Sequence, residues 1–414
     1  MSRAVVALRC LILALALVLT GQTAQAQYAG CRPVFQAQPP ALNACADGGR
    51  YTLAIVGDVL LHSPLQRQGY ATGFHTIWGA AIPFLQAADF AIANLEGPVA
   101  PGLRSGGRQG RDPGRVFDGS VYTSYPMFNY HPTVIPELRA AGVDMVTTAN
   151  NHALDRSSAG ADATVAQLSA AGMPFVGTVA GGAPRQFALQ TGSRLGRIVW
   201  IACTYSTNGI PDRQGQVLHC YNQREALLAL VSAHAARSEV AAVFVLPHWG
   251  NEYQARAASA ERGLARALVA AGATAVIGTH PHVVQNWEIL PGRGMNVPVI
   301  YSTGNFVSGQ TGLDRQTGML AWLELCRSRP GADMGPALRS RVAVASAGWL
   351  AIRMARTAQG RQLVIADSSG IMQAAAASHN LIEGRVPGYA LMPRLACTGA
   401  QASGTTSALA VGLQ

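Results

Sequence analysis

The feature that most constrains this chain is a repeated pattern in which a short apolar segment ends in polar residues and a helix-like segment follows. Apolar segments of this kind lie at residues 51–58, 89–97, 143–151, 197–206, 240–250, 273–282 and 298–306. Helix-like segments lie between them at residues 74–88, 132–142, 159–172, 224–237 and 261–272. Short strands that alternate with helices predict an α/β fold.

Two regions depart from this alternation. The apolar segments after Pro281 follow one another without helices, and more strand-like segments occur at 341–355 and 360–369. This predicts a second, antiparallel sheet, and therefore two stacked sheets covered by helices. Residues 101–129 are rich in Gly and Arg and are predicted to form a long surface insertion. We expect one domain over residues 51–370, with a partly disordered C-terminal extension over residues 371–414.

The first 26 residues resemble a secretory signal peptide. Arg3 and Arg9 supply the positive region, residues 11–19 the apolar region, and Ala24-Gln25-Ala26 the cleavage site. The apolar region is too short to span a bilayer as a stop-transfer helix, although an uncleaved anchor and lipidation at Cys31 are alternatives. Residues 27–50 are predicted to be an exposed lead-in. We therefore expect a secreted, periplasmic or cell-surface protein with no transmembrane span after cleavage.

Six of the seven cysteines remain once Cys10 is removed with the signal peptide. An even number in an oxidising compartment predicts disulfide bonds, although sequence alone leaves fifteen pairings open. Closeness in sequence favours the pairs Cys31–Cys45, Cys203–Cys220 and Cys326–Cys397. The chain has no Cys-x-x-Cys motif, which argues against a zinc–thiolate site.

The charge of the chain is basic, and all 31 of its basic residues are arginine. The absence of lysine excludes P-loop and Schiff-base lysine chemistry. The net charge of +10 becomes +8 when Arg3 and Arg9 leave with the signal peptide. The arginines are scattered and not interleaved with aromatic residues, which argues against a nucleic-acid surface. A positive surface suits an anionic polymer or lipid headgroups, or it reflects only genomic base composition.

Metal-ligand side chains follow the ends of five predicted strands. Ligands of open α/β sheets bind beyond the carboxyl ends of the strands, so these side chains are expected to lie close together. The candidate ligands are Asp58, Glu96, Asn151, His248, His280 and His282. A set that mixes oxygen ligands with imidazoles suits one or two ions of Mn, Fe or Zn better than Ca²⁺. On an extended segment, His280 and His282 would point to the same side, with Glu96 bridging two ions.

The series GDVLLH, NLEG, TTANNHALD, HWGNEY, GTHPHVVQ and YSTGNF, in this order, resembles the CapA family. That family is named for capsule and poly-γ-glutamate synthesis and belongs to the calcineurin-like metallophosphoesterase superfamily. The resemblance covers Tyr51 to Phe306. It implies an α-β-β-α sandwich of two stacked mixed sheets flanked by helices.

The resemblance also implies roles for individual residues. Asp58 and His282 would bind a first metal, Glu96 would bridge, and a second metal would be bound by Asn151, His248 and His280. His152 would stabilise the leaving group, with Asp155 orienting it.

The chain departs from the superfamily pattern at two positions. Leu60 stands where the superfamily has a histidine, and the nearby His62 would need a turn to reach the metal. Glu96 replaces a shorter aspartate. Both departures leave phosphoesterase activity unassured.

Three further residues beside these motifs are candidates for supporting roles. Glu252 is a candidate general base or a partner of a ligating histidine, and Asn305 is a structural or a functional residue of its turn. His62 joins them as a candidate that contacts the metal ligands or the substrate. Tyr253 and Trp249 flank the His248 loop. They either stack on a ligand or pack in the core or at the rim of the site.

Three functions remain open at this point. The first is an exported CapA-like protein of capsule or poly-γ-glutamate synthesis, export or processing, with a metal-dependent hydrolase site. The second is a non-catalytic component of an envelope export complex that binds metal or a polyanion. The third is a secreted metallophosphoesterase acting on a phosphoester. Metal-dependent catalysis in the first and third would rest on ions that activate a water for attack on an ester or amide.

Overall fold

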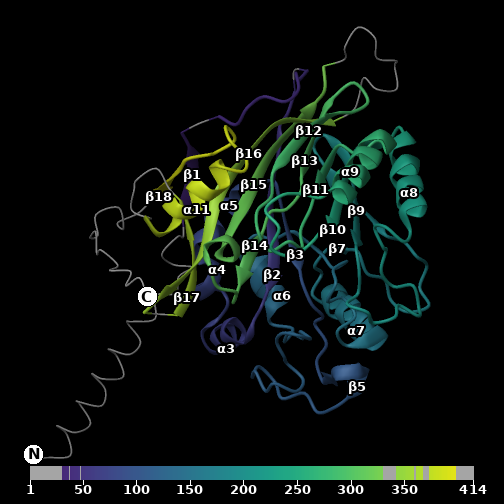
Figure 1. The fold of residues 1–414 in the computed structure, drawn as a ribbon, viewed down its shortest axis with the longest axis vertical. Helices are drawn as coiled ribbons and strands as arrows, with labels where there is room; N and C mark the ends of the chain where they lie inside the picture. The colour runs from purple at the N-terminus through teal and green to yellow at the C-terminus, as the bar shows by residue number, and fades with distance from the viewer. Residues whose placement is uncertain are drawn as a thin grey trace, which may run out of the picture.

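The computed structural model describes residues 30–36, 38–46, 48–329, 342–358, 360–366 and 373–397. The predicted signal peptide, the end of the predicted extension after Cys397 and residues 330–341 lie outside these ranges. Within them, two large mixed β-sheets are stacked and helices lie on their outer faces (Figure 1). The predicted fold class, a sandwich of two stacked mixed sheets flanked by helices, is confirmed.

The first sheet has the strand order β17-β16-β15-β2-β3-β6-β7, and β14 also pairs with β2. Its strands are β2 (Tyr51–Leu60), β3 (Phe90–Leu95), β6 (Met145–Thr147), β7 (Phe175–Val176), β14 (Asn305–Ser308), β15 (Thr317–Arg327), β16 (Val342–Thr357) and β17 (Gly360–Ile365). The strands β2, β3, β6 and β7 are parallel, whereas β15, β16 and β17 extend the sheet in antiparallel fashion.

The second sheet has the order β12-β13-β11-β10-β9-β8. Its strands are β8 (Ala188–Ser193), β9 (Gly196–Thr204), β10 (Val240–His248), β11 (Ala275–Ile277), β12 (Trp287–Pro291) and β13 (Asn296–Ile300). The four central strands are parallel, and β8 and β12 are antiparallel edges. The expectation that the strands after Pro281 form a separate antiparallel sheet is therefore wrong. Of these strands, β12 and β13 belong to the second sheet, and β14, β15, β16 and β17 belong to the first.

The helices cover the outer faces of the two sheets. They are α3 (Ser63–Thr72), α4 (His75–Trp78), α5 (Ile82–Ala87), α6 (Val134–Ala140), α7 (Ser157–Ala170), α8 (Arg224–Ala236), α9 (Ser259–Ala271), α10 (Leu313–Gln316) and α11 (Gln373–Glu383), with short 3₁₀ turns at Gly79–Ala81 and Ser105–Gly107. The predicted helix over residues 74–88 is divided by the first of these turns, since Pro83 sits at the start of α5. In Figure 1, α8 and α9 lie beside the second sheet and α11 lies beside β16.

Alternation of side chains along the strands produces three core layers. On β2, Leu53 and Ile55 face the second sheet, whereas Ala54 and Val56 face the helices. On β9, Trp200 packs between the sheets, while its neighbours on the strand pack under α8 and α9. Successive strand side chains point to opposite faces, and both faces are buried here. This is why the strands appear in the sequence as nearly continuous apolar segments.

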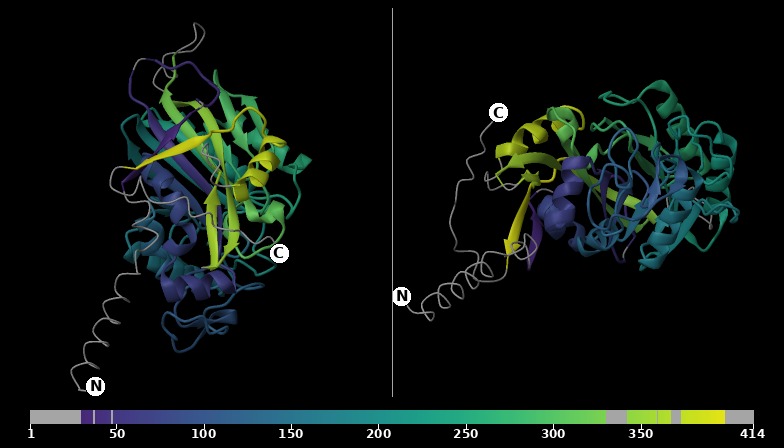
Figure 2. Two further views of the ribbon diagram at one scale, coloured as in Figure 1. Left: turned by 90° about the vertical axis from the view of Figure 1, so that its left-hand side faces the viewer. Right: turned by 90° about the horizontal axis from the view of Figure 1, so that it is seen from below.

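The two ends of the described chain are joined to each other. Strand β1 (Cys31–Phe35) pairs in antiparallel fashion with β18 (Pro393–Cys397), and a disulfide links Cys31 to Cys397. Both strands are seen together at one side of the molecule in Figure 2. Part of the predicted lead-in is thus a paired strand.

The disulfide pairing corrects two of the three predicted bonds. The Cys203–Cys220 bond is confirmed, but the other bonds join Cys31 to Cys397 and Cys45 to Cys326. Closeness in sequence failed because β1 pairs with a strand at the other end of the chain. Cys45 instead lies beside Ser328, next to the end of β15. No helix of the described ranges is long and apolar enough to cross a membrane.

Candidate metal centre

Asp58 is aimed at the sheet edge by a close approach of two backbone segments. The pairing of β2 with β3 shifts register between Ile55 and Asp58, and such irregularities re-aim side chains beside functional sites. Gly57 sits at this point, where a Cβ would lie 1.7 Å from the carbonyl oxygen of Gly304. Only glycine fits there, and the Asp58 backbone N–H donates to the same Gly304 oxygen at 3.2 Å. The Asp58 side chain is completely buried.

Glu96 follows the end of β3 and its carboxylate is also completely buried. Neither carboxylate oxygen has a hydrogen-bond partner in the described part of the chain. Its closest charged neighbours are imidazole nitrogens, with Oε1 lying 3.5 Å from Nε2 of His248 and 3.7 Å from Nε2 of His282. A buried carboxylate without partners is costly, which makes Glu96 the group most in need of a cation.

The loop after β11 brings His280 and His282 to the same place by a strained backbone. Both residues have positive φ angles, 100° for His280 and 58° for His282. These angles are rare for residues other than glycine and cluster at functional sites. The expectation of an extended His-x-His segment is therefore wrong. Just before this bend, Gly278 packs tightly against the backbone of Tyr301, whose oxygen would lie 2.1 Å from an added Cβ.

His282 is oriented so that one ring nitrogen faces Glu96. Its other nitrogen, Nδ1, lies 3.0 Å from Oδ1 of Asn305 and 3.2 Å from Oδ2 of Asp58. Both of those oxygens are acceptors, so Nδ1 carries a proton, and Nε2 is the nitrogen that can bind a metal once it has lost its own proton. A ligating histidine held by an acceptor at its second nitrogen is the usual arrangement in metal sites. Asn305 thus positions His282, and its amide also donates to the His282 carbonyl oxygen at 3.2 Å.

His248 and Asn151 approach each other from different sheets. Nε2 of His248 lies 2.9 Å from Oδ1 of Asn151, and Nδ1 lies 2.9 Å from Oγ1 of Thr279. The Asn151 amide donates to Oδ1 of Asn208 at 3.2 Å, which turns its oxygen toward His248. If Nδ1 of His248 carries the proton and donates it to Thr279, Nε2 is left with a lone pair. That lone pair and the Asn151 oxygen, 2.9 Å apart, are then both available to a metal ion.

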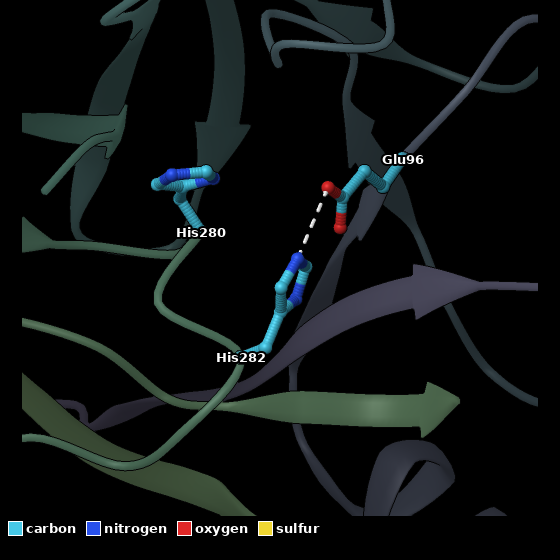
Figure 3. Close-up of side chains that lie close together, drawn as sticks. All are labelled: Glu96, His280 and His282. Atoms are coloured by element: carbon cyan, nitrogen blue, oxygen red, sulfur yellow. Dashed lines mark ion pairs between the residues drawn. The ribbon is translucent and has the colours of Figure 1, made fainter. Parts of the chain in front are cut away.

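Ligand atoms of Glu96, His280 and His282 lie within 4.8 Å of one another. In Figure 3, Glu96 and His282 point toward each other, and His280 lies on the same loop as His282. Nδ1 of His280 is buried without a hydrogen-bond partner. These three residues fit a divalent ion, because a partnerless carboxylate and partnerless imidazole nitrogens are its ligand types. Asp58, Asn151 and His248 surround this group at the contacts given above.

The pKa values of the group reflect its burial and charge. Burial opposes ionisation of Glu96, but the imidazoles of His282 and His248 outweigh it and hold the Glu96 pKa below its usual range. Burial, together with His248 and His282, lowers the pKa of His280 well below its usual range, so His280 is neutral. Burial also opposes charge on His282, yet Glu96 and Asp58 raise its pKa to about 9.

His152 and Asp155 form a buried hydrogen-bonded pair beside this centre. Nδ1 of His152 lies 2.7 Å from Oδ2 of Asp155, which also accepts the backbone N–H of Phe128 at 2.6 Å. Burial lowers the pKa of His152, but Asp155 outweighs it and raises that pKa above its usual value. Burial raises the pKa of Asp155 against the opposing effect of His152.

The predicted surface insertion is largely exposed over residues 104–120, and its last residues pack beside the site. The Phe128 ring lies between two histidine rings, with centroids 4.8 Å from His152 and 5.3 Å from His62. His62 is partly buried, and burial lowers its pKa to about 4. Its Nδ1 lies 3.2 Å from the backbone N–H of Gly309. His62 is therefore held at the edge of the site and forms no part of the close ligand group.

Glu252 lies further out than the other predicted site residues. Its side chain is exposed. Burial raises the pKa of Tyr253, and the Glu252 carboxylate next to it raises it further. Within the described residues, no hydrogen bond joins Glu252 to a candidate ligating histidine. The structure thus gives Glu252 no position as the partner of a ligand.

The sequence reasoning missed residues that hold the candidate ligands in place. Asn94 donates to Oδ1 of Asp58 at 2.7 Å and lies 3.2 Å from His248 Nδ1. Its own oxygen accepts from Thr147 at 3.0 Å and Asn150 at 3.3 Å. Asn94 and Asn150 stood at predicted strand ends, and that position was the available signal. Thr279 carried no such signal.

The two stacked mixed sheets, with a carboxylate and imidazole cluster at the ends of their parallel strands, define this chain as an α/β sandwich protein with a candidate metal centre. The profile of the family described as "Bacterial capsule synthesis protein PGA_cap" matches residues 52–310, and the chain belongs to this family. The resemblance inferred from the six motifs is thus confirmed.

Named relatives agree with this membership. The capsule biosynthesis protein CapA of Bacillus anthracis is 23% identical over 264 residues, which is 63% of this chain and 60% of that protein. The PGA biosynthesis protein CapA of Bacillus subtilis (strain 168) is 24% identical over 267 residues, 62% of this chain and 63% of that protein. The chain thus spans about three fifths of the relatives that it matches. Among solved structures, the NAD nucleotidase of Haemophilus influenzae matches 82% of this chain and 63% of its own, at 7% identity and a TM-score of 0.42.

Proposed function

We propose that this chain is an exported, metal-dependent hydrolase or transferase that acts on an anionic capsule-type polymer. The observation that carries the proposal is the Glu96 carboxylate, which is completely buried, ionised and without a hydrogen-bond partner among the described residues. The charged or polar atoms nearest to it are imidazole nitrogens, Nε2 of His248 at 3.5 Å and Nε2 of His282 at 3.7 Å from Oε1. Such a carboxylate is best satisfied by a divalent cation.

Six side chains would hold the metal. Glu96, His280 and His282 would be its inner group, and Asp58, Asn151 and His248 would complete it. A bound divalent ion supplies a Lewis acid and lowers the pKa of water toward neutrality. The chain's own task is to keep these ligands fixed, through Asn94, Asn305 and Thr279.

The His152–Asp155 pair supports a role in proton transfer. The proton on Nδ1 of His152 is held by Asp155, so Nε2 is the nitrogen that exchanges a proton with the substrate. With its pKa raised by Asp155, His152 is suited to donate to a leaving-group oxygen near neutral pH. Nε2 makes no hydrogen bond within the described residues.

Two observations support export and a polymer substrate. Three disulfides join the six described cysteines, and disulfides persist in oxidising compartments. This agrees with the signal peptide expected at residues 1–26. The capsule biosynthesis relatives and the positive net charge support an anionic polymer as the substrate.

The test is metal analysis followed by a hydrolysis screen on purified protein. Wild type is expected to retain a divalent metal and to cleave a γ-glutamyl oligomer or a nitrophenyl phosphate, whereas His280→Ala loses both properties. His234→Ala is the matched control, because His234 is a half-buried histidine of α8 outside the site. Metal retention without turnover on any substrate would favour the non-catalytic export component. Turnover of the nitrophenyl ester alone would favour a secreted phosphoesterase.

A further inference from the structure

We propose that Tyr253 and Arg315 form an anion-binding subsite at the mouth of the candidate metal centre. It would hold a carboxylate or phosphate group of the substrate chain beside the bond that is cleaved. The binding part of this inference stands on the geometry of the two residues. Only its relation to cleavage rests on the proposed function.

Tyr253 is fixed directly above the candidate ligands. Its backbone N–H donates to the carbonyl oxygen of Pro281 at 2.8 Å, and Pro281 lies between the two ligating histidines. Its ring centroid lies 6.2 Å from that of His282. The side chain nevertheless remains 47% exposed. A ring that is anchored over a buried ligand and open to solvent is placed to contact a substrate.

The backbone of Tyr253 is strained, which an ordinary surface loop would avoid. Its φ angle is 64°, a left-handed conformation that costs free energy in a bulky residue. The hydroxyl lies 3.3 Å from Nε2 of Gln310, which fixes the far end of the ring. Strain that is held by contacts at both ends of a side chain is typical of positions that serve a site.

Arg315 lies on the Tyr253 ring and is tied to the same histidine. Its guanidinium carbon is 5.2 Å from the ring centroid, within cation–π range. Its carbonyl oxygen accepts the Asn305 amide at 2.9 Å, and Asn305 in turn holds Nδ1 of His282. The cation is thus positioned relative to the candidate ligand through two short links.

The guanidinium of Arg315 is available for an anion. Among the described residues, no carboxylate lies within ion-pair distance of it. The neighbouring Asp314 is already paired with Arg385 at 2.5 Å. A planar guanidinium stacked on a ring keeps its edge free for two-point contact with a carboxylate or phosphate.

A second exposed aromatic residue belongs to the insertion, Tyr125, which is 75% exposed. In the described part of the chain, Tyr125 and Tyr253 are the two large aromatic residues with exposed side chains. An exposed aromatic face that carries a cation favours a flexible chain with anionic groups, such as a polyglutamate or a polyphosphate.

The experiment measures binding of two labelled probes to metal-free protein. The probes are a short oligomer of γ-linked glutamate and a polyphosphate of similar length, followed by fluorescence anisotropy. Arg315→Ala is expected to weaken binding of at least one probe about tenfold, because a hydrogen-bonded charge pair is lost. Arg315→Lys is expected to retain only part of the wild-type affinity, and Tyr253→Phe most of that affinity. Arg237→Ala is the matched control, since Arg237 pairs with Glu239 just after the C-terminal end of α8.

The outcomes separate this proposal from the proposed function. Loss of binding of the glutamate oligomer identifies carboxylate as the anion, and loss of binding of polyphosphate identifies phosphate. Wild-type binding of both probes by a folded Arg315→Ala variant would overturn the subsite, as would an equal loss in Arg237→Ala. His280→Ala is expected to bind the probes normally. If that variant binds normally while wild type neither holds metal nor hydrolyses substrate, the proposed function fails and the subsite stands.

Discussion

The Nδ1 atom of His282 lies 3.2 Å from Oδ2 of Asp58, which places a buried acid behind the ring nitrogen that faces away from Glu96. His282 is therefore enclosed by two carboxylates, and burial is outweighed so that its pKa rises to about 9. When the ring is protonated, its Nε2 proton points into the space beside Glu96 that a metal cation would fill. Metal binding must therefore displace this proton.

The affinity for metal is expected to rise with pH up to about pH 9. Because the His282 pKa is raised above neutrality, the ring is protonated at pH 7, and a metal ion competes with that proton. Affinity should increase roughly tenfold per pH unit below the pKa and level off above it. Calorimetric titration in buffers of different ionisation enthalpy should show release of about one proton per ion at pH 7. A flat affinity between pH 6 and pH 9 would contradict the role of His282.

Glu96→Gln is expected to abolish stabilisation by metal while leaving the fold intact. The wild-type protein should gain about 2.7 kcal/mol of unfolding free energy when metal is present at 100 times its Kd. The variant keeps the volume of the side chain but loses the charge that attracts the ion. Thermal unfolding with and without metal measures this gain, and His234→Ala serves again as the control. An equal gain in Glu96→Gln would remove Glu96 from the ligand set.

Two glycine substitutions are expected to have opposite effects on stability. At Gly57, an added Cβ would lie 1.7 Å from the Gly304 oxygen, so Gly57→Ala must move β2 or β14. We expect a loss of about 3 kcal/mol or more, together with weaker metal binding through Asp58. At Gly263, within α9, an added Cβ meets nothing within 4 Å. Gly263→Ala should stabilise the protein by roughly 0.5–1 kcal/mol. Denaturant titration of both variants checks the sign of each effect.

The strand ends could be predicted because two local signals coincide there. An apolar segment of five to ten residues that stops at Asp58, Glu96 or His248 carries both the strand period and the ligand side chain. Parallel strands place their carboxyl ends at one edge of a sheet, which predicts that these ligand side chains meet there.

Features set by distant contacts could not be predicted. The positive φ angle of His280 is not indicated by any local residue type, since a histidine rarely adopts it. The antiparallel strand β15 is defined by its pairing with β2 and β16, on both of its sides. The pairing of Cys31 with Cys397 needs β1 and β18 to meet across 366 residues.

Removal of the Cys45–Cys326 bond is expected to destabilise the protein more than removal of the Cys203–Cys220 bond. The first closes a loop with a separation of 281 residues and the second one of 17. Loop entropy predicts a cost of about 3 kcal/mol for the short loop and roughly 5 kcal/mol for the long one. Unfolding of the two paired Cys→Ser variants in denaturant measures the difference. Equal costs would show that strain or residual structure dominates over loop entropy.

Asp155→Asn is expected to lower the pKa of His152 and to slow any proton-dependent step. Burial acts on His152 to lower its pKa, and the charge and hydrogen bond of Asp155 are what raise it. Without that charge, the pKa should fall below its usual value of about 6.5, because only burial and the more distant charges remain. The Oδ1 atom of the carboxamide can still accept the hydrogen bond from Nδ1 of His152, so the ring position should change little.

Titration of the His152 ring by NMR gives the pKa without reference to activity. On an active substrate, the rate should fall about 100-fold or more, and the alkaline limb of its pH profile should move to lower pH, because His152 must be protonated to donate. An unchanged His152 pKa would show that Asp155 supports the Phe128 backbone alone.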